Sequence, residues 1–328
     1  MSTQDVTGAD LFAPLRGSGN PGKEPRVECK ESRGLVGVGG LLDTVQLGDN
    51  VTVLSTLPAE CIDLVVTSPP YDDLRTYGGH SWDFAGVASE LTRVLKPGGV
   101  IVWVVADATV NGSETGTSMR QAIRFMELGM KLHDTMIWEK TGSGCMGSPY
   151  CYAQNYEFMF VLAKGKAKTA NMICDRENVI KSGSVKVNGV NGGIKKDGTY
   201  DTKIIERKPF GKRTNIWRIQ PAQKTGHPAA FPMELATDHI RSWSNPGDVV
   251  LDPFAGSGTT LKAAKELNRH WLGIEINPDY VEICKARLSQ DALSLFSGGG
   301  GGFSSENPST AEKGHNAIGE AQPPAKKP

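Results

Sequence analysis

Two short segments of the sequence contain residue types that suit nucleoside binding and group transfer. The first is Asp252–Thr260, which reads DPFAGSGTT and follows the apolar run DVVL. A glycine-rich turn between a strand and a helix lets a ligand approach the backbone, with free N–H groups at the helix start. Glu275 stands 23 positions after Asp252, where an acid can accept hydrogen bonds from both hydroxyls of a ribose. The segment therefore predicts a cofactor that contains a nucleoside.

The glycine turn differs from two common nucleotide-binding motifs. Gly256 and Gly258 are followed by Thr-Thr-Leu, so the turn lacks the GxGxxG of dinucleotide enzymes and the Gly-Lys-Ser/Thr of P-loops. Phe254 lies within the turn and could lie against an adenine or a sulfonium. The alternative for Phe254 is an ordinary phenylalanine of the core.

The second segment is Thr67–Tyr71, which reads TSPPY and ends the apolar run CIDLVV. In open parallel sheets, ligands bind at the edge formed by the carboxyl ends of the strands. Two prolines cannot continue a central ladder and they stiffen the chain, so this turn can aim a carbonyl and a side-chain oxygen at one polar group. Tyr71 offers a flat face for a ring. The alternative is a turn that only ends the strand.

Strand-like and helix-like stretches alternate along the part of the chain that must position these segments. Strands are expected at 61–67, 100–106, 132–139, 156–163, 248–253 and 271–276, and helices at 84–96, 118–130, 232–244, 259–267 and 278–295. Strands separated by helices form βαβ units. The expected fold class is therefore α/β, a mostly parallel sheet with helices on both faces.

Charge is balanced over the whole chain but not along it. The 328 residues include 36 Lys+Arg and 36 Asp+Glu, which excludes a cationic coat over the whole protein. Residues 164–213 hold thirteen basic and five acidic residues, a net charge of +8. This basic insertion predicts a surface that meets phosphates. The alternative is a solvated, mobile insertion.

The sequence predicts one folded domain, residues 41–296, between two segments without periodicity. Residues 1–40 are rich in Gly, Pro, Ser and charge and are predicted to be disordered, and residues 297–328 form a predicted Gly-rich flexible tail. No apolar run approaches the roughly 20 residues that cross a bilayer, and no secretory signal is recognisable. The short apolar runs predict that the protein has no membrane partner. None of the six cysteines forms a CxxC pair, so a metal is not expected either.

TSPPY followed by DPFAGSGTT resembles the β-type amino DNA methyltransferases, the N4-cytosine/N6-adenine DNA methylase family. The similarity continues in four further stretches, VQLGD at 45–49, LKPGG at 95–99, GHPAAFP at 226–232 and NRHWLGIE at 268–275. It covers about residues 41–288 apart from the basic insertion. The resemblance implies a Rossmann-like methyltransferase fold with a circularly permuted motif order, in a bacterial or phage-encoded protein of the cytoplasm.

The resemblance also implies the cofactor, S-adenosyl-L-methionine. It puts Glu275 on the ribose and Asp49 near the adenine, with His227 and Phe231 in the segment at the methionine end. The implied contacts in the glycine turn are Asp252, Pro253, Phe254, Gly256, Gly258 and Thr259.

The implied catalytic residues are Ser68, Pro69, Pro70 and Tyr71. The exocyclic amine of a base is a poor nucleophile, and hydrogen bonds to the Ser68 hydroxyl and the Pro69 carbonyl would localise its lone pair. The base must be flipped out of the duplex, and Tyr71 would stack on it. Members whose motif begins with Ser mostly resemble cytosine-N4 enzymes, so cytosine is favoured, and adenine N6 stays open.

The implied substrate is double-stranded DNA, and the basic insertion becomes the candidate target-recognition segment. Its predicted DNA contacts are Lys195, Lys196, Arg207 and Lys208. His80 and Trp82 are candidates for either DNA contact or packing. The resemblance suggests a homodimer and leaves open a cognate restriction endonuclease. The competing hypotheses are an RNA or protein methyltransferase and an inactive nucleic-acid-binding relative.

Overall fold

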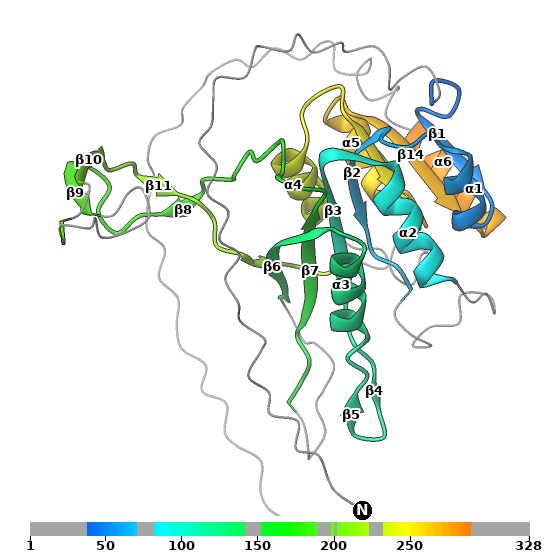
Figure 1. Ribbon diagram of the computed structural model, residues 1–328, viewed down its shortest axis with the longest axis horizontal. Helices are drawn as coiled ribbons and strands as arrows, with labels where there is room; N and C mark the ends of the chain where they lie inside the picture. The colour runs from blue at the N-terminus through cyan, green and yellow to red at the C-terminus, as the bar shows by residue number, and fades with distance from the viewer. Residues whose placement is uncertain are drawn as a thin grey trace, which may run out of the picture. The chain divides into compact units, whose positions relative to one another are not determined.

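A mixed sheet of eight strands lies at the centre of the protein (Figure 1). The computed structural model describes residues 38–70, 82–141, 152–188, 198–199, 202–222 and 232–289. The predicted terminal segments, apart from residues 38–40, lie outside these ranges, as does the end of the predicted helix 278–295. The predicted site residues outside them are Tyr71, Lys195, Lys196, His227 and Phe231, together with His80.

The sheet confirms the prediction of a mostly parallel α/β fold. In spatial order its strands are β1 (Thr44–Leu47), β14 (His270–Glu275), β13 (Val249–Asp252), β2 (Ile62–Thr67), β3 (Leu95–Val105), β7 (Tyr156–Ala163), β6 (Lys131–Lys140) and β12 (Ile216–Ile219). Strand β7 runs antiparallel to both of its neighbours, β3 and β6. The other adjacent pairs are parallel.

Helices cover both faces of the sheet, as predicted (Figure 1). One face packs against α1 (Asn50–Thr56), α2 (Phe84–Val94) and α3 (Thr117–Glu127), and the other against α4 (Met233–Trp243), α5 (Thr259–Glu266) and α6 (Pro278–Ser289). Each face has its own buried apolar cluster, to which the helices contribute residues such as Leu91 of α2 and Leu235 of α4. Burial of these clusters is the main force that fixes the helices on the sheet.

The central strand β3 begins earlier than the sequence predicts. Its buried part, residues 100–105, matches the apolar run, but the strand already starts at Leu95, which pairs with Ile62. The register of this pairing shifts between Ile62 and Leu64, which pairs with Val100. Within the shift, Gly98 adopts a positive φ of 80° and its N–H donates to the carbonyl of Lys164. The Pro-Gly-Gly turn is therefore a bulge within the pairing rather than a loop before it.

The basic insertion contains strands that the sequence did not predict. In its described part, β8 (Arg176–Glu177) pairs with β11 (Phe210–Gly211), and β9 (Ser184–Asn188) pairs with β10 (Thr202–Glu206), both antiparallel. We call residues 174–213 the arm. A short hairpin, β4 (Thr109–Val110) with β5 (Ser113–Glu114), lies elsewhere, between β3 and α3. Among the described helices, none is long and apolar enough to cross a bilayer.

Candidate active site

The two segments singled out in the sequence meet at the centre of the sheet. Strands β2 and β13 are parallel neighbours, so Ser68 and Pro253 follow directly after the carboxyl ends of adjacent strands. The hydroxyl of Thr67 donates to Asp252 Oδ1 at 2.7 Å, across 185 positions of sequence. The chain also winds outward in opposite directions here, through β3 on one side and β14 on the other. In such sheets this switch point is where ligands bind.

Asp252 is the residue that links the two strands at this junction. Its side chain is buried, and Oδ1 accepts hydrogen bonds from the Thr67 hydroxyl and from the backbone N–H of Phe254. Burial raises the pKa of the Asp252 carboxyl to about 6, although the hydrogen bonds from Thr67 and Phe254 act in the opposite direction. The carboxyl group thus joins the two strands and holds the start of the glycine turn.

The glycine turn has the conformation that its sequence predicts. Gly256 and Gly258 have positive φ values of 50° and 79°, and Gly258 is the N-cap of α5. A side chain at Gly258 would overlap the sulfur of Cys284 in α6, so packing and backbone conformation both require glycine there. Thr259 begins α5 with its side chain buried, and Arg287 donates to its hydroxyl at 3.1 Å.

Two carboxylates lie at the same edge as this turn. Strand β1 ends beside the end of β14, with Leu47 paired to Glu275, and Asp49 follows two residues later. Glu275 Oε2 accepts from the N–H of Gly256 at 2.8 Å, and Oε1 from Asn277 at 2.9 Å. Asp49 is exposed and caps α1 by accepting from the N–H of Thr52 at 2.9 Å.

This pair of carboxylates suits a ligand with several hydroxyl or amino donors. A carboxylate oxygen has a second lone pair after it accepts one backbone N–H, and both Asp49 and Glu275 are at least partly exposed. Glu275 therefore both shapes the glycine turn and retains capacity to accept from a vicinal diol. Among the described residues, no group of three or more His, Cys, Asp or Glu side chains is placed to hold a metal ion.

Phe254 is part of an aromatic cluster at the mouth of this site. Its ring contacts Trp82 edge-to-face, with centroids 5.0 Å apart, and Trp103 at 6.4 Å. The indole N–H of Trp103 donates to Gln121 Oε1 at 2.8 Å. Phe254 is only partly buried, so it packs on the core and still presents surface at the turn. Trp82 packs in this cluster, one of the two roles that the sequence left open.

The predicted catalytic residues that the structure describes lie beside this turn. Ser68 and Pro70 are partly buried and Pro69 is buried. The hydroxyl of Thr260, in the first turn of α5, donates to the carbonyl of Val66 at 3.1 Å. The start of α5 is thereby fastened to β2, next to Ser68.

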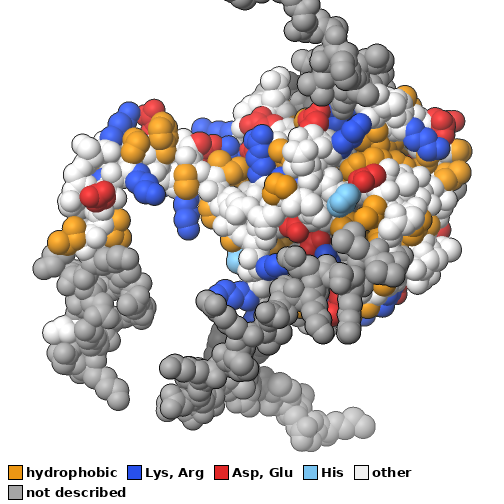
Figure 2. All heavy atoms as spheres, turned by 90° about the horizontal axis from the view of Figure 1, so that it is seen from above, with side chains coloured by type: hydrophobic (Ala, Val, Ile, Leu, Met, Phe, Trp, Pro, Cys, Tyr) orange, Lys and Arg blue, Asp and Glu red, His pale blue; other side chains and the backbone are white. Residues whose placement is uncertain are grey.

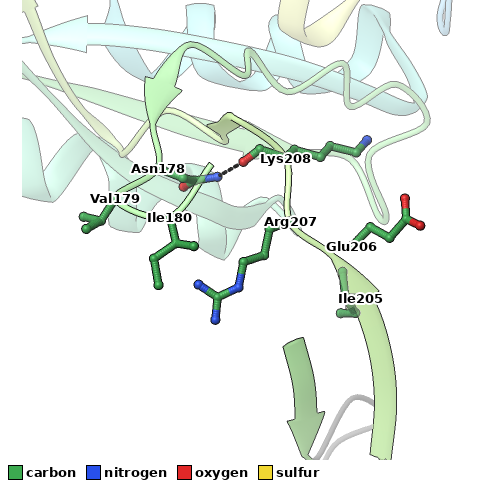
Figure 3. Close-up of a pocket in the computed structure, with 7 residues that line it drawn as sticks. All are labelled: Asn178, Val179, Ile180, Ile205, Glu206, Arg207 and Lys208. Carbon is green, nitrogen blue, oxygen red and sulfur yellow. Dashed lines mark hydrogen bonds between the residues drawn. The ribbon is translucent and has the colours of Figure 1, made fainter. Parts of the chain in front are cut away.

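The arm brings two of the predicted DNA contacts, Arg207 and Lys208, to a shallow groove of about 530 Å³ (Figure 3). The facing segment is fixed because Asn178 donates to the carbonyls of Lys208 and Pro209, each at 2.9 Å. Lys and Arg side chains stand beside hydrophobic ones on the arm, at the left of Figure 2. The exposed apolar residues of the arm include Val179, Ile180, Ile204 and Ile205.

Sequence reasoning missed the role of Thr67 and of residues outside the motifs. The sequence predicts only that Thr67 ends a strand, whereas its hydroxyl joins the two halves of the site. Arg213 and Asp238 form a partly buried ion pair that no motif signals. A single arginine in a basic segment gives no sign that it is folded against a distant helix.

The sequence matches the DNA methylase family model over residues 62–286. It is 49% identical over 235 residues to the orphan methyltransferase M.BamHII of Bacillus amyloliquefaciens, covering 69% of this chain and 88% of that protein. It is 29% identical over 275 residues to the type II methyltransferase M.BglII of Bacillus subtilis, covering 76% and 69%.

Solved structures share the fold. TTHA0409, a candidate DNA modification methylase of Thermus thermophilus solved with S-adenosyl-L-methionine, is 27% identical, with a TM-score of 0.50, covering 76% of this chain and 96% of that one. The cytosine-N4-specific PvuII DNA methyltransferase has a TM-score of 0.53 at 21% identity, covering 76% and 89%, and shows the fold alone. Since the family model spans more than half of the sequence, this chain belongs to the N4-cytosine/N6-adenine DNA methylase family.

Proposed function

We propose that this DNA methyltransferase modifies a specific site in double-stranded DNA at the N4 amine of cytosine. The observation that carries the proposal is the junction of β2 and β13, where Ser68 and Pro69 stand beside the glycine turn. An acceptor pair for an amine and a nucleoside-binding turn thus share one edge of the sheet. The role of each residue below belongs to this proposal.

The methyl donor is S-adenosyl-L-methionine, as predicted, and it supplies an electrophilic methyl group on a sulfonium. Glu275 accepts hydrogen bonds from the ribose hydroxyls with the capacity left after it binds Gly256 and Asn277. Asp49, just after the end of the neighbouring strand, lies near the adenine.

Phe254 provides apolar surface, held by Trp82 and Trp103. His227 and Phe231 complete the methionine end in this proposal.

The chain activates the target amine by accepting its hydrogen bonds. The lone pair of an exocyclic amine is delocalised into the ring, and acceptance by Ser68 Oγ and the Pro69 carbonyl draws the nitrogen towards tetrahedral geometry. Positive charge would develop on that nitrogen as the N–C bond forms and the bond from the sulfonium to the methyl group breaks, leaving a neutral thioether. The fixed acceptors would stabilise this charge until the nitrogen loses one proton to solvent. Two consecutive prolines hold these acceptors in place. Tyr71 stacks on the base, which must leave the duplex to reach them.

The preference for cytosine rests on the serine. A hydroxyl is a weaker acceptor than a carboxylate, and Asp or Asn at this position is commoner for adenine-N6 enzymes. Cytosine, with one ring, also needs a smaller pocket than adenine, which has two. The alternative, adenine N6, uses the same acceptors, turn and cofactor, so identification of the product separates the two.

The deciding experiment is mass spectrometry of nucleosides after unmethylated plasmid DNA has been incubated with the protein and S-adenosyl-L-methionine. We expect N4-methylcytosine, and its loss in Ser68→Ala with cofactor binding retained. N6-methyladenine would overturn the assignment of the base and keep the enzyme class. No methylated base, from protein that binds the cofactor, would overturn DNA methylation by this chain.

The arm is the proposed DNA-recognition segment. Its described part carries Arg207 and Lys208 on the groove of Figure 3, and Lys195 and Lys196 belong to the same basic insertion. Phosphate contacts position such a segment, and side chains that reach base edges give sequence specificity. Apolar side chains beside basic ones offer both kinds of contact.

A further inference from the structure

The two ends of the arm meet at one residue, Arg213. The backbone N–H of Arg213, where the chain leaves the arm, donates to the carbonyl of Ile173, where the chain enters it, at 2.9 Å. The guanidinium of Arg213 also donates to Asp175 through Nε at 2.9 Å and through a second nitrogen. This hydrogen bond lowers the pKa of the Asp175 carboxyl. Arg213 therefore closes the base of the arm.

The same guanidinium fastens the arm to the body of the protein. Its remaining terminal nitrogen donates to Asp238 Oδ2 of α4 at 2.6 Å. The guanidinium carbon, Cζ, lies over the ring of Trp217 in β12, 5.1 Å from the ring centroid. Only 24% of the Arg213 side chain and 9% of the Asp238 side chain are exposed. One side chain thus contacts the arm, a helix and the edge strand of the sheet.

A second contact supports this attachment from the incoming side. The N–H of Asn171 donates to the carbonyl of Ser242 at 2.8 Å, and its side-chain amide to that of Arg241 at 3.2 Å. Both carbonyls lie near the end of α4. The chain is therefore held to α4 on both sides of the arm, by the backbone and side chain of Asn171 just before it and by the guanidinium of Arg213 at its end.

Helix α4 belongs to the half of the protein that holds the glycine turn. It packs against α5 and β2, and the chain runs from α4 directly into β13. A segment fixed to α4 is thus fixed relative to Asp252 and Ser68 at the junction. Arg213 connects the arm to α4 through an ion pair between its guanidinium and Asp238.

We propose that Arg213 is a positioning residue, which fixes the orientation of the DNA-recognition arm on α4 through Asp175 and Asp238. The proposal rests on the proposed function of the arm. When the fork is lost, the arm still carries its basic groups but no longer presents them in register with the flipped base. The KM for DNA should therefore rise while cofactor affinity stays the same. A lysine cannot form the fork, because it is a point charge and Arg is a planar donor.

The experiment compares Arg213→Met and Arg213→Lys with a matched control, Arg218→Met. Arg218 donates to Glu139 through Nε at 2.8 Å but touches no arm residue in the described contacts, and it is 75% exposed. We expect Arg213→Met to raise the KM for DNA at least tenfold, Arg213→Lys less, and Arg218→Met less than twofold. The dissociation constant of S-adenosyl-L-methionine should change less than twofold in all three.

Asp238 provides the second variant, because Arg213→Met leaves its buried carboxylate with only the longer ion pair to Arg241, at 3.8 Å, and can lower the yield of folded protein. Arg213→Met with Asp238→Asn removes both charges, and its KM for DNA should match that of Arg213→Met. A KM within twofold of wild type in this double variant overturns the proposal. So does an equal rise of the KM for DNA and of the cofactor dissociation constant, which would indicate a general structural role.

A separate variant tests the proposed DNA-binding function of the arm independently of the positioning role of Arg213. Arg207→Gln with Lys208→Gln removes basic groups without touching the fork. If this variant binds DNA as wild type does, the DNA-binding function of the arm fails, and the positioning proposal with it. If it binds DNA weakly while the Arg213 variants keep a normal KM, only the positioning proposal fails.

Discussion

The carboxyl group of Asp252 has a different affinity for protons in the folded and unfolded protein. Burial raises its pKa from 3.8 to about 6 in the fold. A raised pKa means that the folded state favours the protonated form. The resulting contribution to the free energy of unfolding is fully present below pH 3.8 and is lost as the pH rises through 6.

Asp252→Asn should therefore change how stability depends on pH. An asparagine keeps an acceptor oxygen for Thr67 and Phe254 but has no charge to bury. Between pH 5 and pH 8, the wild type should lose on the order of 1 kcal/mol of unfolding free energy relative to the variant. Urea unfolding of both proteins at the two pH values measures this difference, and parallel curves would contradict the role of the ionised carboxyl.

Two substitutions of Glu275 should weaken cofactor binding to different extents. Glu275→Ala removes the acceptor for the N–H of Gly256 and the proposed acceptor for the ribose, so the dissociation constant of S-adenosyl-L-methionine should rise about tenfold or more, as expected for lost hydrogen bonds to a charged group. Glu275→Gln keeps one acceptor and should show a smaller rise. Calorimetric titration measures both, with Glu282→Ala, on the exposed side of α6, as the control. An unchanged constant in Glu275→Ala would remove Glu275 from the site.

At the scale of elements, the start of α5 depends on the close approach of α6. Gly258→Ala combines a strained positive φ with overlap on Cys284, whereas Gly247→Ala has a similar φ of 85° and open space around it. We expect Gly247→Ala to lower the unfolding free energy by about 1 kcal/mol and Gly258→Ala by about 1–3 kcal/mol more.

The double variant Gly258→Ala with Cys284→Ala tests whether overlap with Cys284 causes the larger loss of stability in Gly258→Ala. Truncation of Cys284 removes the overlapping sulfur and should restore much of the difference between the two glycine variants. Denaturant unfolding gives all of these values. Equal losses for Gly247→Ala and Gly258→Ala would show that α6 yields to the extra carbon.

Elements with strong periodicity or uninterrupted apolar runs could be predicted from the sequence, even the four-residue strand β13, whereas short strands of mixed composition could not. The run at 156–163 gives β7 with its bounds, and the helices at 84–96 and 259–267 are α2 and α5 within two residues. Strands β1 (TVQL) and β12 (IWRI) also have four residues each, but polar or charged residues interrupt them, so no apolar run marks them. Both are edge strands whose pairing depends on neighbours far away in the sequence.

The candidate site divides in the same way. Residue types and order located the glycine turn, Glu275 and Ser68, because their local motifs are specific. The bond between Thr67 and Asp252 depends on which strands become neighbours, and the fork at Arg213 depends on how the arm folds back. Neither is encoded by a local pattern, so each required the three-dimensional structure.

For the molecule as a whole, electrostatic attraction to DNA must come from a local region because the net charge is zero. Neutralising Lys195, Lys196, Arg207 and Lys208 together should weaken DNA binding and lower the slope of log K against log salt by about 0.9 per lost phosphate contact. Lys262→Gln with Lys285→Gln, on α5 and α6, controls for a general loss of positive charge. Fluorescence anisotropy over a salt series measures the slope. An unchanged affinity and slope would show that DNA binds to another surface of the protein.

The homodimer and a cognate endonuclease stay predictions.

The order of strands in the sheet has a consequence for the timing of folding during synthesis. Strands β1 and β2 are made early, yet β14 and β13 lie between them in the finished sheet. Until β13 has left the ribosome, the chain lacks the pairing of β2 with β13. It also lacks Asp252, which accepts the hydrogen bond from Thr67. The arm precedes β13 in the sequence, so during synthesis the arm leaves the ribosome before the bond between Thr67 and Asp252 can form.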